Sequence, residues 1–159
     1  MTGTPALDDL VTEILNNYRR GRILVAVDGP EARSRARFAD ALAAALRAGG
    51  RSVVRQSAGE PEQYRAGEDD PGARDIVRGF RAGEPDDEML ILDGRFLLRP
   101  RLRGAWHFRI WLEGDIEISP EALSEQIAYV RDEDPRGAAD AIYDVTHADA
   151  PKRVWSDSC

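Results

Sequence analysis

The fold is decided by residues 22–48, RILVAVDGPEARSRARFADALAAALRA. Residues 23–27 of this stretch are continuously apolar and rich in β-branched side chains, which is typical of a strand buried on both faces of a parallel sheet. Asp28 and Gly29 end the strand, and an Ala-rich segment with one apolar helical face follows them. The stretch therefore predicts a strand, a tight loop and a helix.

The loop of this unit lies where a P-loop, G-x-x-x-x-G-K-[ST], would bind phosphate. The glycines of such a loop let backbone N–H groups curl around phosphate oxygens, while its lysine and hydroxyl residue bind phosphate and Mg²⁺. Counted from Gly29, the second glycine position holds Ser34. Arg35 and Ala36 stand at the lysine and hydroxyl positions. The scaffold indicates a kinase, whereas the residues at the site argue against one.

Length and composition predict a single folded domain over residues 1–159, with 42% hydrophobic residues. A net charge of −7 argues against a general nucleic-acid or anionic-membrane surface. No apolar run approaches the roughly 18 residues of a membrane span, and no secretory signal is recognisable. The single cysteine, Cys159, excludes an internal disulfide and a cysteine metal cluster. We therefore expect a cytoplasmic protein with no nucleic-acid or membrane partner.

Strand-like and helix-like segments alternate along the rest of the chain. Residues 1–20 form a helix whose apolar stripe packs on the body or forms a homodimer interface, and residues 57–72 are a polar, turn-rich loop. Because strands alternate with helices, we expect right-handed crossovers and a parallel sheet with helices on both faces. The further strands are expected at residues 52–55, 89–92, 107–112 and 141–145, with helices over 73–81 and from Pro120 onward.

Several stretches resemble the uridine kinase-like proteins of the P-loop nucleoside kinase family, especially its short actinobacterial type. VDG at residues 27–29 and FADALAAAL at 38–46 flank the altered loop. Residues 90–112 resemble the family's third strand through its fourth, and DPRGAADAIYDVTHADAPK, at residues 134–152, resembles its closing elements. The resemblance implies an α/β, three-layer P-loop NTPase-like fold with a five-stranded parallel sheet of order 2-3-1-4-5. It also implies ATP-dependent phosphorylation of a nucleoside with Mg²⁺.

The sequence departs from the family's pattern at its chemical centre. Arg35 replaces the lysine with a bulkier, planar cation. Ala36 and Arg37 replace two hydroxyl residues, one of which would hold magnesium. Ala32 replaces a further loop glycine, and the acid that would activate the nucleoside hydroxyl is matched only by SAG at residues 57–59. The arginine-bearing lid and the nucleoside-binding insertion are shortened as well.

Two functional hypotheses follow. Phosphoryl transfer depends on positioning and charge neutralisation, and the departures remove most of both. The favoured hypothesis is a uridine kinase-like protein with a degraded ATP/Mg site, acting as a catalytically impaired nucleotide- or anion-binding module or as a protein-interaction module. The alternative is an active ATP-dependent phosphotransferase on an unidentified small substrate, with Arg35 for phosphate, Asp93 for magnesium and Asp28 as base.

The candidate ligand-binding residues surround the start of the second helix, where the helix dipole favours anions. One hypothesis is a rebuilt site for a phosphate or nucleotide anion without magnesium. The other is a solvated basic turn in which Arg37 pairs with an acid such as Asp40. The predicted cofactor-binding residues are Gly29, Arg33, Ser34, Arg35 and Arg37.

Two carboxylates are the candidates for catalysis. Asp28 could polarise a ligand at the crevice, or it could stabilise the tight turn that it precedes. Asp93 could hold a metal-bound water at the end of a strand, or it could cap the loop before Phe96. Because Ala36 offers no partner hydroxyl, we predict no metal site and keep Asp93 as the remaining candidate ligand. The cofactor stays open, with ATP and Mg²⁺ as the pair that the resemblance implies.

Overall fold

The computed structural model describes residues 5–61, 63–84 and 86–155, so Cys159 lies outside the described residues. Within these ranges six strands form one sheet in the order β2-β3-β1-β4-β5-β6. The strands are β1 (Ile23–Asp28), β2 (Val53–Ser57), β3 (Met89–Gly94), β4 (Phe108–Glu113), β5 (Ala141–Asp144) and β6 (Lys152–Val154). The helices are α1 (Pro5–Asn17), α2 (Ala32–Ala48), α3 (Pro71–Arg81), α4 (Pro120–Glu133) and α5 (Pro135–Ala138), with a 3₁₀ turn at Arg103–Ala105.

The sheet corrects the sequence-based prediction. Strands β1 to β5 pair in parallel, but β6 pairs antiparallel with β5, with Arg153 opposite Tyr143. The predicted sheet of five parallel strands in the order 2-3-1-4-5 is therefore wrong in count, in order and in being wholly parallel. β6 escaped prediction because it is three residues long and opens with Lys152 and Arg153, without an apolar pattern. Charged side chains of this kind are common at sheet edges, where they discourage pairing with other chains.

The helices begin where capping residues precede them. The helix predicted over 73–81 starts at Pro71, because the Asp70 carboxylate accepts a 3.0 Å hydrogen bond from the Ala73 amide. The helix predicted from Pro120 is confirmed, and Ser119 caps it through a 3.1 Å bond to the Ala122 amide. Among the described residues, no helix is long and apolar enough to cross a membrane.

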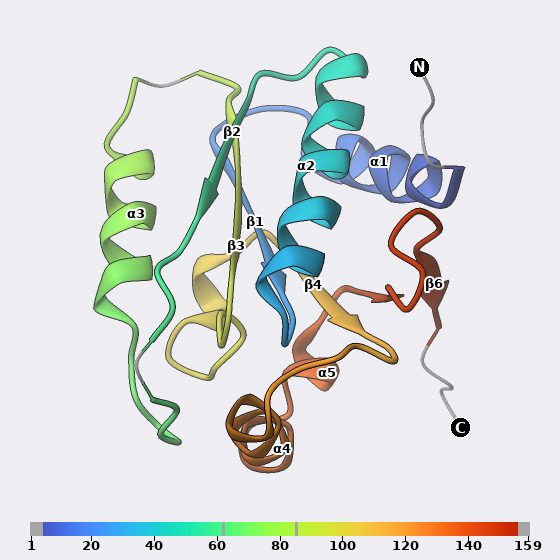
Figure 1. Cartoon of the computed structure of the whole chain (residues 1–159). Coiled ribbons are helices and arrows are strands. Elements are labelled where there is room, and N and C mark those ends of the chain that lie inside the picture. The colour runs from blue at the N-terminus through green and yellow to red at the C-terminus, as the bar shows by residue number, and fades with distance from the viewer. Residues whose placement is uncertain (1–4, 62, 85, 156–159) are drawn as a thin grey trace.

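The core lies on both faces of the sheet. β1 is buried along its whole length, as the apolar run predicted. Helices α1 and α2 cover one face, to the right in Figure 1, and α3 covers the other. Residues 95–106 and Tyr129 of α4 complete the second layer. The architecture is therefore α/β with helices on both faces of a mixed, mostly parallel sheet.

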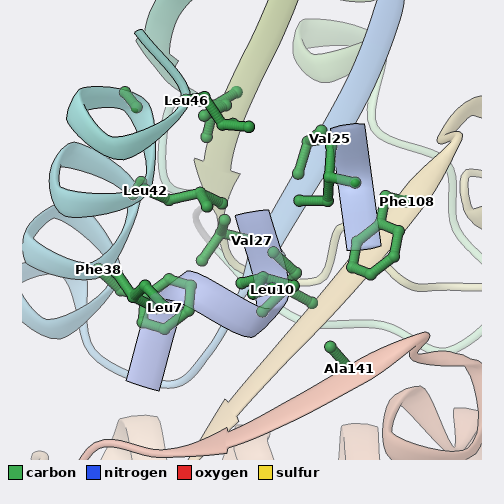
Figure 2. Packing of buried hydrophobic residues seen from close by; sticks show 14 of the residues in the cluster. Leu7, Leu10, Val25, Val27, Phe38, Leu42, Leu46, Phe108 and Ala141 are labelled. Carbon is green, nitrogen blue, oxygen red and sulfur yellow. The ribbon is translucent and has the colours of Figure 1, made fainter. Parts of the chain in front are cut away.

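The first core layer explains the apolar stripe of the N-terminal helix. Figure 2 shows α2 side chains directed toward α1 and toward the central strands. Leu7, Leu10 and Ile14 of α1 are almost fully buried within this chain, so the stripe forms core. The residues that meet in this view are Leu7, Leu10, Val25, Val27, Phe38, Leu42, Leu46 and Phe108.

Candidate functional site

The candidate site lies at the carboxyl ends of β1 and β3, beside the first turn of α2. In open parallel sheets this edge is where ligands bind. Asp28 ends β1 and lies opposite Gly94 of β3, while Asp93 lies opposite Val27. Both predicted carboxylates are thus brought to one edge, next to the loop that occupies the P-loop position.

The N-terminus of α2 is occupied by a carboxylate of the protein itself. Glu31 is the N-cap residue, and its Oε2 accepts hydrogen bonds from the backbone amides of Arg33 and Ser34. Its Oε1 accepts a further bond of 3.1 Å from the Ser34 hydroxyl. First-turn amides of this kind are the groups that bind phosphate at a helix start. Glu31 therefore fills the position that an anion would take.

Arg35 does not face solvent, as a basic turn or an open anion site would require. Its side chain is buried, with the residue only 2% exposed. Its Nη1 donates a 2.9 Å bond to the Gly29 carbonyl, and its Nη2 binds the Glu60 carboxylate. Its Nε lies 3.5 Å from Oδ2 of Asp93. The guanidinium is therefore held by one carbonyl and two carboxylates from three segments of the chain.

Gly29 permits this arrangement by its small size. A Cβ atom added at Gly29 would lie 3.0 Å from the Cβ of Leu112 and 3.5 Å from the Arg35 side chain. The contact with Leu112 is tighter than ordinary van der Waals contact, so any side chain at position 29 would require Leu112 to shift. Glycine therefore suits the close packing of this loop against β4.

Asp93 is the centre of a buried cluster of charges and is 2% exposed. Its Oδ2 faces Arg35, while its Oδ1 forms an ion pair with Nη2 of Arg55 at 2.8 Å and accepts a hydrogen bond from the Ser57 hydroxyl. Arg55 also pairs with Asp40 at 3.0 Å. Two guanidinium groups thus neutralise one carboxylate. Asp93 does not cap the loop before Phe96, so that part of the prediction is wrong.

The residues at this site do not fit a magnesium ion. Ala36 offers no oxygen at the hydroxyl position, and both oxygens of Asp93 are engaged by arginine and serine groups. Magnesium requires oxygen ligands in near-octahedral geometry. Among the described residues, no group of three or more His, Cys, Asp or Glu side chains is arranged to hold a metal ion.

The other two arginines of the loop lie away from this cluster. Arg37 is exposed and pairs with an acid, as one hypothesis expected, but its partner is Asp149 at 2.6 Å and not Asp40. Arg33 is exposed and forms no ion pair within the described part of the chain. The hollow that Ser34 and Arg37 line holds about 30 Å³. Small-molecule sites usually measure about 300–1,000 Å³, so this hollow does not admit a nucleotide.

Asp28 holds the loop that follows β3. Its Oδ1 accepts a 3.2 Å bond from the amide of Phe96, a residue with a positive φ of 63°. Its Oδ2 accepts bonds from the Leu98 amide at 3.2 Å and the Tyr129 hydroxyl at 2.7 Å. The register between β1 and β3 explains this reach, because Asp28 lies opposite Gly94, just before the loop. Asp28 thus stabilises a distant turn instead of the turn that it precedes.

The protonation of Asp28 is perturbed in the direction typical of catalytic acids. Burial raises the pKa of Asp28 from 3.8 to about 6, and the hydrogen bond from Tyr129 opposes this rise. A general base must also reach a substrate proton. Asp28 is 1% exposed, and both of its oxygens already accept bonds from the protein. Its elevated pKa is therefore explained by burial in the core.

Sequence reasoning missed Glu31, Glu60, Arg55 and Tyr129. Glu31 lies within three residues of its partners, but glutamate is not among the favoured N-cap residues. Arg55 lies in β2 and Glu60 in the loop that follows it, at least 20 residues beyond Arg35. Glu60 reaches Arg35, and Arg55 reaches Asp93, only once the sheet has formed. No local spacing signals such contacts.

The comparisons with known proteins agree with this fold. No protein-family model matches the chain, and no curated protein does. Four chains of solved structures match it. One is a possible uridine kinase from Bacillus stearothermophilus, which is 20% identical over 87% of this chain and 97% of that chain, with a TM-score of 0.65. The likeness shows that the chain shares the fold of that possible uridine kinase.

Proposed function

We propose that this chain is a catalytically impaired, uridine kinase-like module that acts through protein interaction. The observation that carries the proposal is the occupation of the α2 N-terminus by Glu31. A carboxylate of the chain itself stands where the fold would hold a phosphate group. The residues that would bind phosphate are replaced in the sequence, and Glu31 fills the place where the phosphate would bind.

Each group that phosphoryl transfer needs has another role here. Phosphate would be held by amides that bind Glu31, and by a cation that binds Glu60 and Asp93. The magnesium hydroxyl position holds Ala36, and the candidate base Asp28 is inaccessible. Enzymes accelerate phosphoryl transfer almost entirely by positioning the reactants and stabilising the developing charge. The groups that would provide these effects are missing or occupied here.

The same contacts favour protein interaction over anion binding. A phosphate entering this site would have to displace Glu31 from two amides and Glu60 from Arg35. The incoming anion would also face the buried charge of Asp93. Anion binding by this loop would therefore break the hydrogen bonds that Glu31 and Glu60 already form with its amides and with Arg35.

The proposal is tested by incubating the purified protein with uridine or cytidine, ATP and Mg²⁺. We expect no phosphorylated nucleoside above the level without protein. Turnover by the wild type that disappears in Arg35→Ala would overturn the proposal and support the active phosphotransferase. An Arg37→Ala variant is the matched control, because Arg37 lies on the same helix but pairs only with exposed Asp149.

A further inference from the structure

Helix α4 carries an apolar surface that no described part of the chain covers. Among the described residues, the exposed large hydrophobic side chains are Leu123, Ile127, Val130 and Trp155. The first three are 48%, 55% and 41% exposed and lie at positions i, i+4 and i+7 of one helix. Residues at this spacing share one helical face. Figure 1 shows α4 at the bottom of the molecule, away from α1, α2 and α3.

A groove runs beside this stripe. Its volume is about 270 Å³, and its lining is mainly apolar. Because Leu123 and Val130 line it and are themselves partly exposed, the groove opens toward the stripe on α4. We call this surface the α4 groove, formed by Pro30, Trp111, Ile116, Ile118, Leu123 and Val130. Ile127 lies between Leu123 and Val130 on the same face of α4 and is the middle residue of the exposed stripe.

Three acidic side chains without ion pairs to described residues lie beside the α4 groove. Asp115 and Glu117 alternate with its lining isoleucines, and Glu121 lies in the first turn of α4. All three are exposed, and none forms an ion pair with a described residue. Arg136, which lines the groove, pairs with Glu113 at 2.9 Å, and Arg131 of α4 pairs with Asp132 at 2.8 Å.

We propose that the α4 groove binds a basic amphipathic helix of a partner protein. An apolar groove bordered by acids matches a helix whose apolar side chains enter the groove and whose lysines or arginines meet its rim. This inference rests on the proposed function, because it gives the protein-interaction module its docking surface. It places that surface at the carboxyl end of β4, next to the closed phosphate site.

The charges select this occupant over a second copy of the chain. A symmetric dimer through α4 would bring the acids of both rims together, and each chain already carries a net charge of −7. Like charges placed opposite one another oppose association. An anionic membrane surface would be repelled for the same reason. A basic helix removes this repulsion and buries the stripe.

The test uses a fluorescent peptide of about 14 residues, roughly four helical turns, with leucines on one face and lysines on the other. Its binding to the full chain is followed by fluorescence anisotropy. We expect saturable binding that weakens as salt rises. Ile127→Ser should weaken it at least about tenfold, because Ile127 is the middle and most exposed residue of the α4 stripe, and a well-placed apolar anchor typically contributes that much. Trp155→Ser is the matched control, since Trp155 is exposed and apolar but lies after β6, outside the α4 stripe.

Three results would overturn the inference. Equal binding of a peptide with glutamates in place of the lysines would exclude the charge match. Binding that Ile127→Ser leaves unchanged would move the site elsewhere. A concentration-dependent dimer that Ile127→Ser abolishes would assign the groove to a second copy. Nucleoside phosphorylation in the separate kinase assay would overturn the proposed function, whatever the peptide does, so the two failures are distinguishable.

Discussion

Replacing Asp93 by asparagine tests whether this carboxylate is a structural counter-ion. Asp93 is buried against Arg55 at 2.8 Å and Arg35 at 3.5 Å. Asp93→Asn leaves two largely buried guanidinium groups without their shared negative charge. Removing one partner of a buried ion pair usually costs about 3–5 kcal/mol. For a chain of this size, each kcal/mol lowers Tm by about 2–4 °C, so we expect Tm to fall by about 6–20 °C.

The measurement is thermal unfolding followed by circular dichroism, with Asp40→Asn as the matched control. Asp40 pairs with the same Arg55 at 3.0 Å, but its side chain is 68% exposed. An exposed pair contributes about 0–1 kcal/mol, so the control should lose at most a few degrees. If Asp93→Asn is as stable as Asp40→Asn, or more stable than the wild type, the reasoning is refuted. If Asp93→Asn were instead more stable than the wild type, the Asp93 carboxylate would be destabilising in the native fold, as expected of a group kept for binding a ligand.

Two further predictions concern Asp28 and Glu31. The folded-state pKa of Asp28 is raised from 3.8 to about 6, so its stabilising contribution is present below pH 4 and is lost as pH rises through 6. Urea unfolding from pH 4 to 7 should show the wild type losing about 2 kcal/mol of stability relative to Asp28→Asn; a difference that stays constant with pH would contradict the pKa. Glu31→Ala should lose about 0.5–2 kcal/mol and gain weak, calorimetrically detectable binding of inorganic phosphate, whereas Glu31→Gln should gain none. Phosphate binding by the wild type as strong as by Glu31→Ala would show that Glu31 does not close the site.

The parts of the fold that were predictable are those with strong periodicity. The apolar run of β1 and the one-sided helix after it determine local structure and burial, and both are observed. β6 was not predictable, because three residues with two cations carry no apolar pattern and pair only after residues 146–151 have turned the chain. Pairing partners depend on the folded sheet and not on local sequence.

The candidate site was predictable in position but not in its contacts. The spacing from Gly29 placed Arg35 correctly at the sheet edge, where it contacts the Gly29 carbonyl and Asp93. The roles of the two aspartates differ from the prediction. Asp28 holds Phe96, because parallel pairing of β1 and β3 places it beside that loop. Asp93 is turned toward the arginines instead.

The central claim is that the phosphate site is closed by the protein's own carboxylates. Isothermal titration calorimetry of the wild-type chain with ATP, with and without Mg²⁺, tests it most directly. With Glu31 on the α2 amides and Glu60 on Arg35, we predict no saturable heat in either titration. Saturable binding of ATP that requires Mg²⁺ would contradict the claim.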